Sequence, residues 1–463
     1  MSVLVGVVSA VFWGVLLLSV LVFVHEAGHF LSARAFGMRV TEFFLGMPCR
    51  LRLSHRSASR GTEVGITPVL LGGYTRICGM DGELGPHTAG ILAALARRGR
   101  ATPAELADAV GCDEDEALAD LALLSDWASV EPFFDPELGE RPGQKQWPRS
   151  FQTVRRDANL LTAFDKGHDF SLEGSTLAGE PHGLPEGGAE ALLEFERAHT
   201  YQGKGFVARV VTLLAGPAVN VALGILLVAA TLSIGGVTVA RDVPVVGQVG
   251  EGTLAASCGI QAGDTIRSVN GAEVSTWVDM GDQLKAAIAA GDPFEVTFEH
   301  EGVQATATAV PASFPGQQLF GVTATTETYH PAFVRSLGAA WDYVGQTVSY
   351  IARLFQPQHT AEMVSQSTSV VGISVMASEA AASGPADFFF LMAALSLSLG
   401  FMNLIPVPPL DGGKILIEVI QLVSRRRVPL RVQSAVSYTG LALLMLLFVF
   451  VVRQDVIRFV LGG

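Results

Sequence analysis

The chain has 463 residues, of which 49% are hydrophobic and only 16% are charged, and its mean hydropathy of +0.40 argues against an ordinary soluble enzyme. Its formal net charge of −13 excludes a general basic footprint for nucleic acid. The four cysteines, Cys49, Cys78, Cys112 and Cys258, lie far apart and form no C-x-x-C pair, so a bound metal would be held by His and carboxylate side chains.

The first predicted element is an apolar stretch from Val3 to Val24. A helix needs roughly 20 residues to cross a hydrocarbon core about 30 Å thick, so this stretch predicts a membrane span. No basic segment precedes it and no small-residue cleavage site precedes His25. We therefore expect the segment to stay in the mature chain rather than act as a signal peptide.

The motif His25-Glu26-Ala27-Gly28-His29 follows directly. Residues four apart share one face of a helix, so the two imidazoles can bind one zinc ion while Glu26 acts on water as a general base. The alternative is a group of polar residues that reach from a helix end to the membrane interface. We favour the metal site, because ionisable residues beside a span are costly and functional by default.

Residues 81–204 form an acidic segment with 11 Lys and Arg against 23 Asp and Glu. Its part 88–135 predicts three short helices, the second with Thr102 as N-cap and Pro103 in the first turn, and resembles a winged-helix domain. The third helix repels phosphate because it carries Asp113, Glu114, Asp115, Glu116 and Asp120. We therefore favour a cytoplasmic protein partner over nucleic acid. Residues 141–203, polar and rich in Gly and Pro, predict loop or partial disorder.

A second span is predicted at Phe206–Ile234, within a segment 205–236, and a compact domain follows at residues 241–325. The run from Gly259 to Gly271, G-I-Q-A-G-D-T-I-R-S-V-N-G, resembles the G-L-x-x-G-D-x-I-x-x-V-N-G pattern of bacterial PDZ domains, which are α+β folds. Such domains capture extended peptides by strand addition. A structural β domain without a ligand is the alternative.

Residues 330–357 predict an amphipathic helix at the membrane interface. Its aromatic residues, mixed with polar ones, are Trp341, Tyr343, Tyr350 and Phe355.

The third predicted span, Phe388–Ile405, lies in a segment 386–424 and runs into Asn403-Leu-Ile-Pro-Val-Pro-Pro-Leu-Asp411-Gly-Gly. Three prolines must stop the helix there. A catalytic zinc uses three protein ligands and keeps one position open, so Asp411 is the candidate third ligand. The fourth span is Val436–Val452, in a segment 434–455.

Basic residues near the span ends predict the orientation. They place the insertion 81–204 in the cytoplasm, and the N-terminus and residues 235–387 outside. These basic residues are Arg34, Arg39, Arg50, Arg52, Arg56, Lys204, Arg209, Arg425, Arg426, Arg427 and Arg431.

The two metal motifs resemble those of the site-2 protease family, in particular the bacterial branch that contains the regulator of sigma E protease. The resemblance implies that His25, His29 and Asp411 ligate Zn²⁺, that Glu26 activates water and that Asn403 helps to hold the unwound substrate.

Three further stretches resemble parts of that family. Residues 65–74 resemble its membrane-reentrant β-hairpin, in which Gly72-Gly73-Tyr74 precedes a short substrate-binding strand. Residues 215–220 resemble the start of its second core helix. Gly372 falls in a loop where the family tends to have Gly-Pro.

The predicted architecture is an α-helical polytopic membrane protein with four transmembrane helices, a membrane-reentrant β-hairpin in residues 1–80, an extracytoplasmic PDZ domain and a cytoplasmic winged-helix-like insertion. The predicted function is intramembrane zinc metalloproteolysis of pre-trimmed single-span proteins in the bacterial inner membrane, with anti-sigma factors or remnant signal peptides as implied substrates. Two alternatives are a membrane-tethered sensor and a metal transporter. Glu26 argues against the sensor, because a structural site needs no base. The near absence of ionisable groups from spans two and four argues against the transporter.

Overall fold

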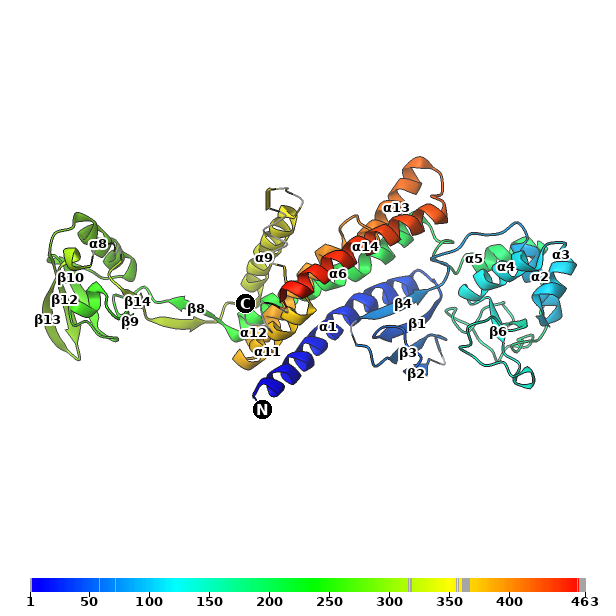
Figure 1. Cartoon of the computed structure of the whole chain (residues 1–463), viewed down its shortest axis with the longest axis horizontal. Coiled ribbons are helices and arrows are strands. Elements are labelled where there is room, and N and C mark those ends of the chain that lie inside the picture. Colours follow the sequence, from blue (N-terminus) through cyan, green and yellow to red (C-terminus); the bar gives the residue numbers. More distant parts are fainter. Residues whose placement is uncertain are drawn as a thin grey trace. The chain divides into compact units, whose positions relative to one another are not determined.

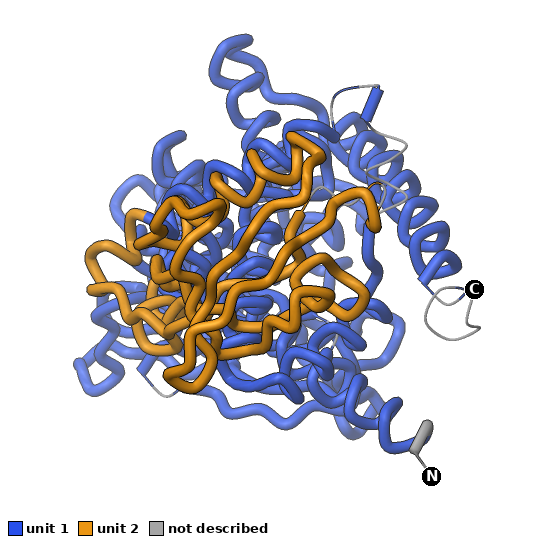
Figure 2. Tube along the Cα trace, turned by 90° about the vertical axis from the view of Figure 1, so that its left-hand side faces the viewer, with its two compact units in different colours: residues 1–228, 339–463 blue, residues 229–338 orange. Residues whose placement is uncertain are grey.

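The computed structural model describes residues 2–57, 59–70, 72–314, 316, 319–354, 356, 358–359, 367–455 and 457. The elements are labelled along the chain in Figure 1. The chain forms two compact units, residues 1–228 with 339–463, and residues 229–338 (Figure 2).

Among the described residues, four helices are long and apolar enough to cross a membrane. They are α1 (Ser2–Ala35), α6 (Phe206–Ala230) with the π-helical turn η2 (Thr231–Gly235), α12 (Pro385–Asn403) and α14 (Leu430–Asp455). They correspond to the four predicted spans. Helix α1 continues past the predicted end at Val24, so the H-E-x-x-H motif lies inside the helix.

A shorter apolar helix, α11 (Val370–Ser383), packs against α1 where the sequence predicted a loop around Gly372. The two helices approach closely at small residues. A Cβ on Gly14 would lie 2.1 Å from Ser374 Oγ, and the hydroxyls of Ser9 and Ser378 are 2.7 Å apart. Small residues allow such close approach between membrane helices. The loop prediction was therefore wrong, because 14 residues are too few to be recognised as a span.

A four-stranded sheet follows α1, in the order β2-β3-β1-β4. The strands are β1 (Val40–Leu45), β2 (Leu53–Arg56), β3 (Glu63–Ile66) and β4 (Gly73–Ile77). The predicted single hairpin at residues 65–74 is thus part of a larger sheet. Strands β3 and β4 do not pair with each other but flank β1, with β3 parallel and β4 antiparallel to it. Leu71 lies outside the described residues.

The third span ends where the prolines predict. Helix α12 stops at Asn403, and α13 (Asp411–Ser424) begins at Asp411 after a non-helical linker. The linker contacts its neighbours closely, since a Cβ on Gly413 would lie 2.3 Å from the nitrogen of Pro408. Asp411 therefore becomes the first residue of a new helix.

The acidic insertion folds around its own apolar core, which includes Ile91, Leu106, Leu121 and Phe151. Its three-stranded sheet has the order β5-β7-β6. Thr102 caps α3 in a capping box with Glu105, as the sequence predicted for the N-cap. The elements are α2 (Thr88–Arg98), β5 (Arg100–Ala101), α3 (Pro103–Val110), α4 (Glu114–Asp126), β6 (Val130–Phe133), the 3-10 turn η1 (Pro136–Leu138), β7 (Ser150–Thr153) and α5 (Gly188–Arg197).

A buried ionic network joins the insertion to the segment after α1. Arg39, which is fully buried, contacts Asp165 at 2.7 Å and Glu196 at 2.5 Å, and Glu196 also contacts Arg156 at 2.6 Å. Burial disfavours all these charges. The ion pairs outweigh this cost of burial: they raise the pKa of Arg39 and hold the pKa of Glu196 well below its usual range. Residues 141–203, predicted to be loop or partly disordered, contain β7 and α5 and are otherwise mostly irregular, and they supply Arg156, Asp165 and Glu196 to this network.

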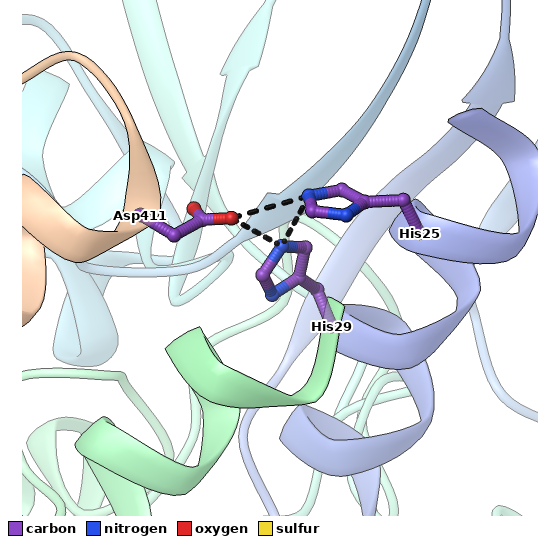
Figure 3. Close-up of side chains that lie close together, drawn as sticks. All are labelled: His25, His29 and Asp411. Atoms are coloured by element: carbon purple, nitrogen blue, oxygen red, sulfur yellow. Dashed lines mark hydrogen bonds and ion pairs between the residues drawn. The ribbon is translucent and has the colours of Figure 1, made fainter. Parts of the chain in front are cut away.

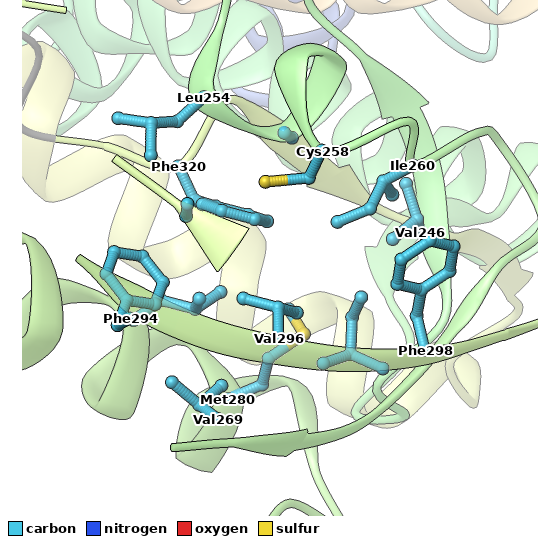
Figure 4. Close-up of a cluster of buried hydrophobic side chains, with 14 of the residues drawn as sticks. Val246, Leu254, Cys258, Ile260, Val269, Met280, Phe294, Val296, Phe298 and Phe320 are labelled. Atoms are coloured by element: carbon cyan, nitrogen blue, oxygen red, sulfur yellow. The ribbon is translucent and has the colours of Figure 1, made fainter. Parts of the chain in front are cut away.

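The second unit has an apolar core, shown in Figure 4, built from residues such as Val246, Val296, Phe298 and Phe320. Its main sheet has the order β11-β10-β12-β13, with two smaller strand pairs, β14-β9 and β15-β8. The elements are β8 (Val237–Ala240), β9 (Val246–Val249), α7 (Leu254–Ser257), β10 (Thr265–Val269), β11 (Ala272–Glu273), α8 (Trp277–Ala290), β12 (Phe294–His300), β13 (Val303–Ala309), the 3-10 turn η3 (Pro311–Ser313), β14 (Val322–Ala324) and β15 (Thr326–Tyr329).

Helix α9 (Phe333–Arg353) occupies the predicted amphipathic segment. Large apolar side chains are exposed along it, including Val334, Trp341 and Tyr350. Phe355, which the sequence placed on the same helix, lies outside the described residues.

Candidate metal centre

Three side chains from distant parts of the chain converge at α1 (Figure 3). His25 and His29 lie one helical turn apart on α1, and Asp411 comes from the start of α13. Asp411 Oδ2 is 3.1 Å from His25 Nε2 and 3.3 Å from His29 Nε2, and the two Nε2 atoms are 3.2 Å apart.

This spacing fits a zinc ion. Zinc bonds of roughly 2.0–2.1 Å at tetrahedral angles put neighbouring ligand atoms about 3.3 Å apart, close to the three separations here. Three protein ligands leave a fourth position open, as a catalytic rather than a structural zinc site requires. Both histidine residues are 8% exposed. The donor set of two imidazoles and one carboxylate also suits zinc.

The position of Asp411 favours the ionised form that a metal ligand requires. Its Oδ2 atom faces the Nε2 atoms of His25 and His29. Its place in the first turn of α13 also favours a negative charge, because the N-terminal end of a helix is partly positive.

The backbone of α6 orients the ring of His29. His29 Nδ1 lies 2.8 Å from the carbonyl oxygen of Thr212. A carbonyl can only accept, so Nδ1 carries the proton and Nε2 is left with its lone pair facing Asp411 and His25. Partners of this kind orient metal-binding histidines in many proteins.

Helix α6 reaches the site at two small residues, Ala215 and Gly216, which the family resemblance indicated only as the start of a helix. A Cβ on Gly28 would lie 2.5 Å from the carbonyl oxygen of Ala215, and a Cβ on Gly216 would lie 2.3 Å from His29 Nε2. The contact between α1 and α6 therefore requires glycine on both sides. The sequence shows the small residues Gly28 and Gly216, but it does not show that the two helices meet at them.

Strand β4 runs beside the glutamate of the motif. Thr75 Oγ1 donates to the carbonyl oxygen of Glu26 at 3.1 Å. A Cβ on Gly73 would lie 3.3 Å from Glu26 Cγ and 3.2 Å from Val22 Cγ1. Strand β4 is at one end of the sheet order, so its far side has no strand partner among the described residues.

The other predicted site residues lie around this strand and the proline linker. Tyr74 stacks on Phe44 of β1 with ring centroids 5.3 Å apart. The carbonyl oxygen of Gly72 accepts from the backbone of Gly46 at 2.7 Å. Asn403 is the half-buried last residue of α12, eight positions before Asp411.

The site can support hydrolysis. A zinc ion bound there would lower the pKa of a water molecule towards about 7 and polarise a carbonyl group. Glu26 follows His25 directly and is half-buried, which suits a general base. Together with the four long apolar helices, these features define a multi-pass membrane zinc metalloprotease.

Comparison with known proteins supports the assignment to the zinc metalloproteases. The model of peptidase family M50 matches residues 13–447, so the chain belongs to this family of site-2 proteases. Zinc metalloprotease RasP of Geobacillus kaustophilus is 26% identical over 451 residues, covering 95% of this chain and 96% of the relative. The regulator of sigma-W protease RasP of Bacillus subtilis is 24% identical over 455 residues, covering 97% and 99%.

Proposed function

We propose that this zinc metalloprotease is an intramembrane endopeptidase, which hydrolyses peptide bonds within the transmembrane segments of pre-trimmed single-span membrane proteins. One observation carries the proposal: the convergent His25, His29 and Asp411 side chains lie on and against a helix that is itself a candidate span, Leu4–Ala35. A soluble metalloprotease does not need a metal site on a helix that is apolar and long enough to cross a membrane.

In this proposal His25, His29 and Asp411 hold the zinc ion and Glu26 is the general base. Glu26 removes a proton from water as the water oxygen attacks the peptide carbonyl carbon. The same carboxyl group then gives the proton to the leaving nitrogen as the C–N bond breaks. The products are a new carboxyl end and a new amino end.

Strand β4 is proposed to bind the substrate as an added strand. A helical substrate satisfies its own backbone hydrogen bonds, and in a membrane it cannot unwind unless other groups replace them. The side of β4 away from β1, which has no strand partner among the described residues, offers such groups along Gly73–Ile77, next to Glu26. Gly72, Gly73 and Tyr74 would then line the bound segment, and Asn403 would hold it from the α12 side.

Contacts within the first unit support membrane re-entry of this sheet. Ser19 Oγ, near the middle of the span Leu4–Ala35, donates to the carbonyl oxygen of Leu70 at 3.0 Å. The loop between β3 and β4 therefore reaches well along α1. Apolar side chains are exposed near it, among them Met47, Val64, Ile66 and Val69. Exposed apolar side chains fit a lipid environment better than water.

The domain 241–325 is proposed to be an extracytoplasmic PDZ domain that contacts substrates or peptides. A pocket of about 460 Å³ lies between the β9–β14 strand pair and α8, with the apolar lining residues Val249, Trp277, Met280, Leu284, Leu319, Phe320 and Val322. An extended peptide could add to β14, which among the described residues pairs only with β9, while α8 receives the peptide's side chains. Amphipathic helix α9, within residues 330–357, is proposed to lie at the outer membrane interface.

The insertion 81–204 is proposed to be a cytoplasmic protein-contact module, winged-helix-like at 88–135. Three helices with a small three-stranded sheet support the resemblance. The first turn of α4 exposes Glu114, Asp115 and Glu116, which would repel nucleic acid. The positive-inside distribution of Arg and Lys supports this orientation in the bacterial inner membrane.

Substrates are proposed to include anti-sigma factors and remnant signal peptides. The name of the Bacillus subtilis relative, regulator of sigma-W protease, supports the first class. Trimming by another protease would come first, because a bulky outer domain would not pass the outer module.

The test uses the full chain in cells and in detergent, with a tagged panel of single-span membrane proteins. Native protein and Glu26→Gln are compared for cleavage and for bound zinc. The proposal expects cleavage by the native chain, and no cleavage but native zinc content in Glu26→Gln. Unchanged processing by a zinc-loaded Glu26→Gln variant would overturn the assigned base. Cleavage of loops but of no membrane segment would overturn the intramembrane substrate class.

A further inference from the structure

Asn220 on α6 faces His25, the other histidine of the candidate zinc site. It is fully buried, and its side-chain Nδ2 lies 3.4 Å from His25 Nδ1. The same amide has a second polar atom, Oδ1, which is buried without a hydrogen-bond partner. Buried polar atoms without partners are rare in folded proteins and call for an explanation.

The two histidines are held differently on their outer sides. His29 Nδ1 faces a backbone carbonyl, which can only accept. His25 Nδ1 faces a side-chain amide, which carries both a donor and an acceptor. A half-turn of the amide group exchanges these two atoms with almost no change in shape.

If His25 binds zinc through Nε2, its Nδ1 must face the oxygen of the Asn220 amide rather than the nitrogen. The proposed ligand atom of His25 is Nε2, so the ring proton must be on Nδ1, which then needs an acceptor. Asn220 Oδ1 can supply it after the half-turn. That arrangement gives a partner both to Nδ1–H and to the otherwise unpaired oxygen.

Asn220 is itself held in place from the other side. Ser396 Oγ on α12 donates to the backbone carbonyl oxygen of Asn220 at 2.7 Å. Both residues are fully buried. The contact ties α6, which carries Asn220, to the helix that leads to Asp411.

From this geometry we infer that Asn220 is a positioning residue for the zinc site. Its side-chain oxygen accepts the Nδ1 proton of His25 and so presents Nε2 to the metal. The inference rests on the proposed zinc ligands. It concerns metal affinity and ligand geometry, so it can be tested without a substrate.

The test measures zinc affinity of the purified full chain in detergent, by competition with a chelator, for native protein, Asn220→Leu and Asn220→Asp. Leucine has a similar size but no acceptor, so we expect affinity to fall about 10- to 100-fold. Aspartate keeps an acceptor at the same place, so we expect it to retain most of the affinity. Cobalt substituted for zinc should show altered visible absorption bands in Asn220→Leu and near-native bands in Asn220→Asp.

Two controls separate this inference from the ligand assignment and from folding. His25→Ala must lose zinc; if it binds zinc like the native chain, the proposed ligand set fails instead. Gel-filtration behaviour and protease resistance establish that each variant is folded.

Native affinity and cobalt bands in Asn220→Leu would overturn the inference. Equal losses in folded Leu and Asp variants would also overturn it, because the acceptor would then be irrelevant. Should Asn220→Leu fail to fold, Asn220→Asp decides alone: near-native affinity and cobalt bands support the acceptor role, and clear loss in the folded variant overturns it.

Discussion

Gly216 lies against the imidazole of His29 so closely that a Cβ at position 216 would be 2.3 Å from His29 Nε2, the atom assigned to zinc. The backbone of α6 thus forms one wall of the metal site. The contact between α1 and α6 therefore helps to shape the candidate zinc site.

Gly216→Ala should therefore impair the metal site. The added methyl group must displace either α6 or the ring of His29, and we expect zinc affinity to fall at least about tenfold, with cleavage falling in parallel. Chelator competition measures the affinity. Gly6→Ala on α1 is the control, because a Cβ there meets nothing within 4 Å. Native zinc affinity in Gly216→Ala would contradict the close approach.

A proline at position 74 should block cleavage without removing zinc. Tyr74→Pro removes a backbone donor from β4, whereas Tyr74→Phe keeps the backbone and the ring that stacks on Phe44. We expect loss of cleavage only in the proline variant, at unchanged zinc content. Ser54→Pro, on β2 at the opposite edge of the sheet, controls for general sheet damage. Equal effects of the two prolines would argue against substrate binding along β4.

Arg39→Met should loosen the insertion. It leaves the buried carboxylates of Asp165 and Glu196 without one partner, and removal of one member of a buried ion pair costs roughly 3–5 kcal/mol. Limited proteolysis of residues 141–203 should become much faster. The matched control is Arg76→Gln, which removes an exposed pair with Asp126 and should cost about 1 kcal/mol or less. Identical proteolysis rates for the two variants would contradict the network's role.

The second unit should lose stability as pH rises through the folded-state pKa of His300. A hydrogen bond to Asp264, at 2.5 Å from His300 Nδ1, raises the pKa of His300. A raised folded pKa means that protonation stabilises the fold. This stabilising contribution is fully present below the unfolded-state pKa of about 6.5 and is lost as the pH rises through the raised folded-state pKa.

Hydrogen exchange of β10 and β12 in the full chain measures this effect. Corrected for intrinsic rates, protection in the native chain should exceed that in His300→Gln at pH 5.5, and the two should converge by pH 9. Arg267→Gln removes an exposed pair with Glu299 on the same strands and should lower protection equally at both pH values. A pH-independent difference between native and His300→Gln would refute the titration.

Much of this protein could be predicted from the sequence, because the relevant signals are local. A long apolar run predicts a span whatever surrounds it, and H-E-x-x-H predicts a metal site because residues four apart share a helix face. The prolines before Asp411 predict a helix break for a reason confined to a few residues. The zinc metalloprotease class followed from these motifs together.

Other features depend on which segments meet, and only the tertiary structure decided them. Helix α11 does not resemble a span in the sequence, because its 14 residues are too few to cross a membrane and include Ser374, Ser378 and Glu379; only the structure shows that it packs on α1. Residues 65–74 contain no sign that β3 and β4 would flank β1 rather than pair with each other. The roles inferred for Gly216 and Asn220 arise because α6 crosses α1 at the histidines. A single sequence encodes the small and polar residues at such a crossing, but their partners are set by packing between helices far apart along the chain.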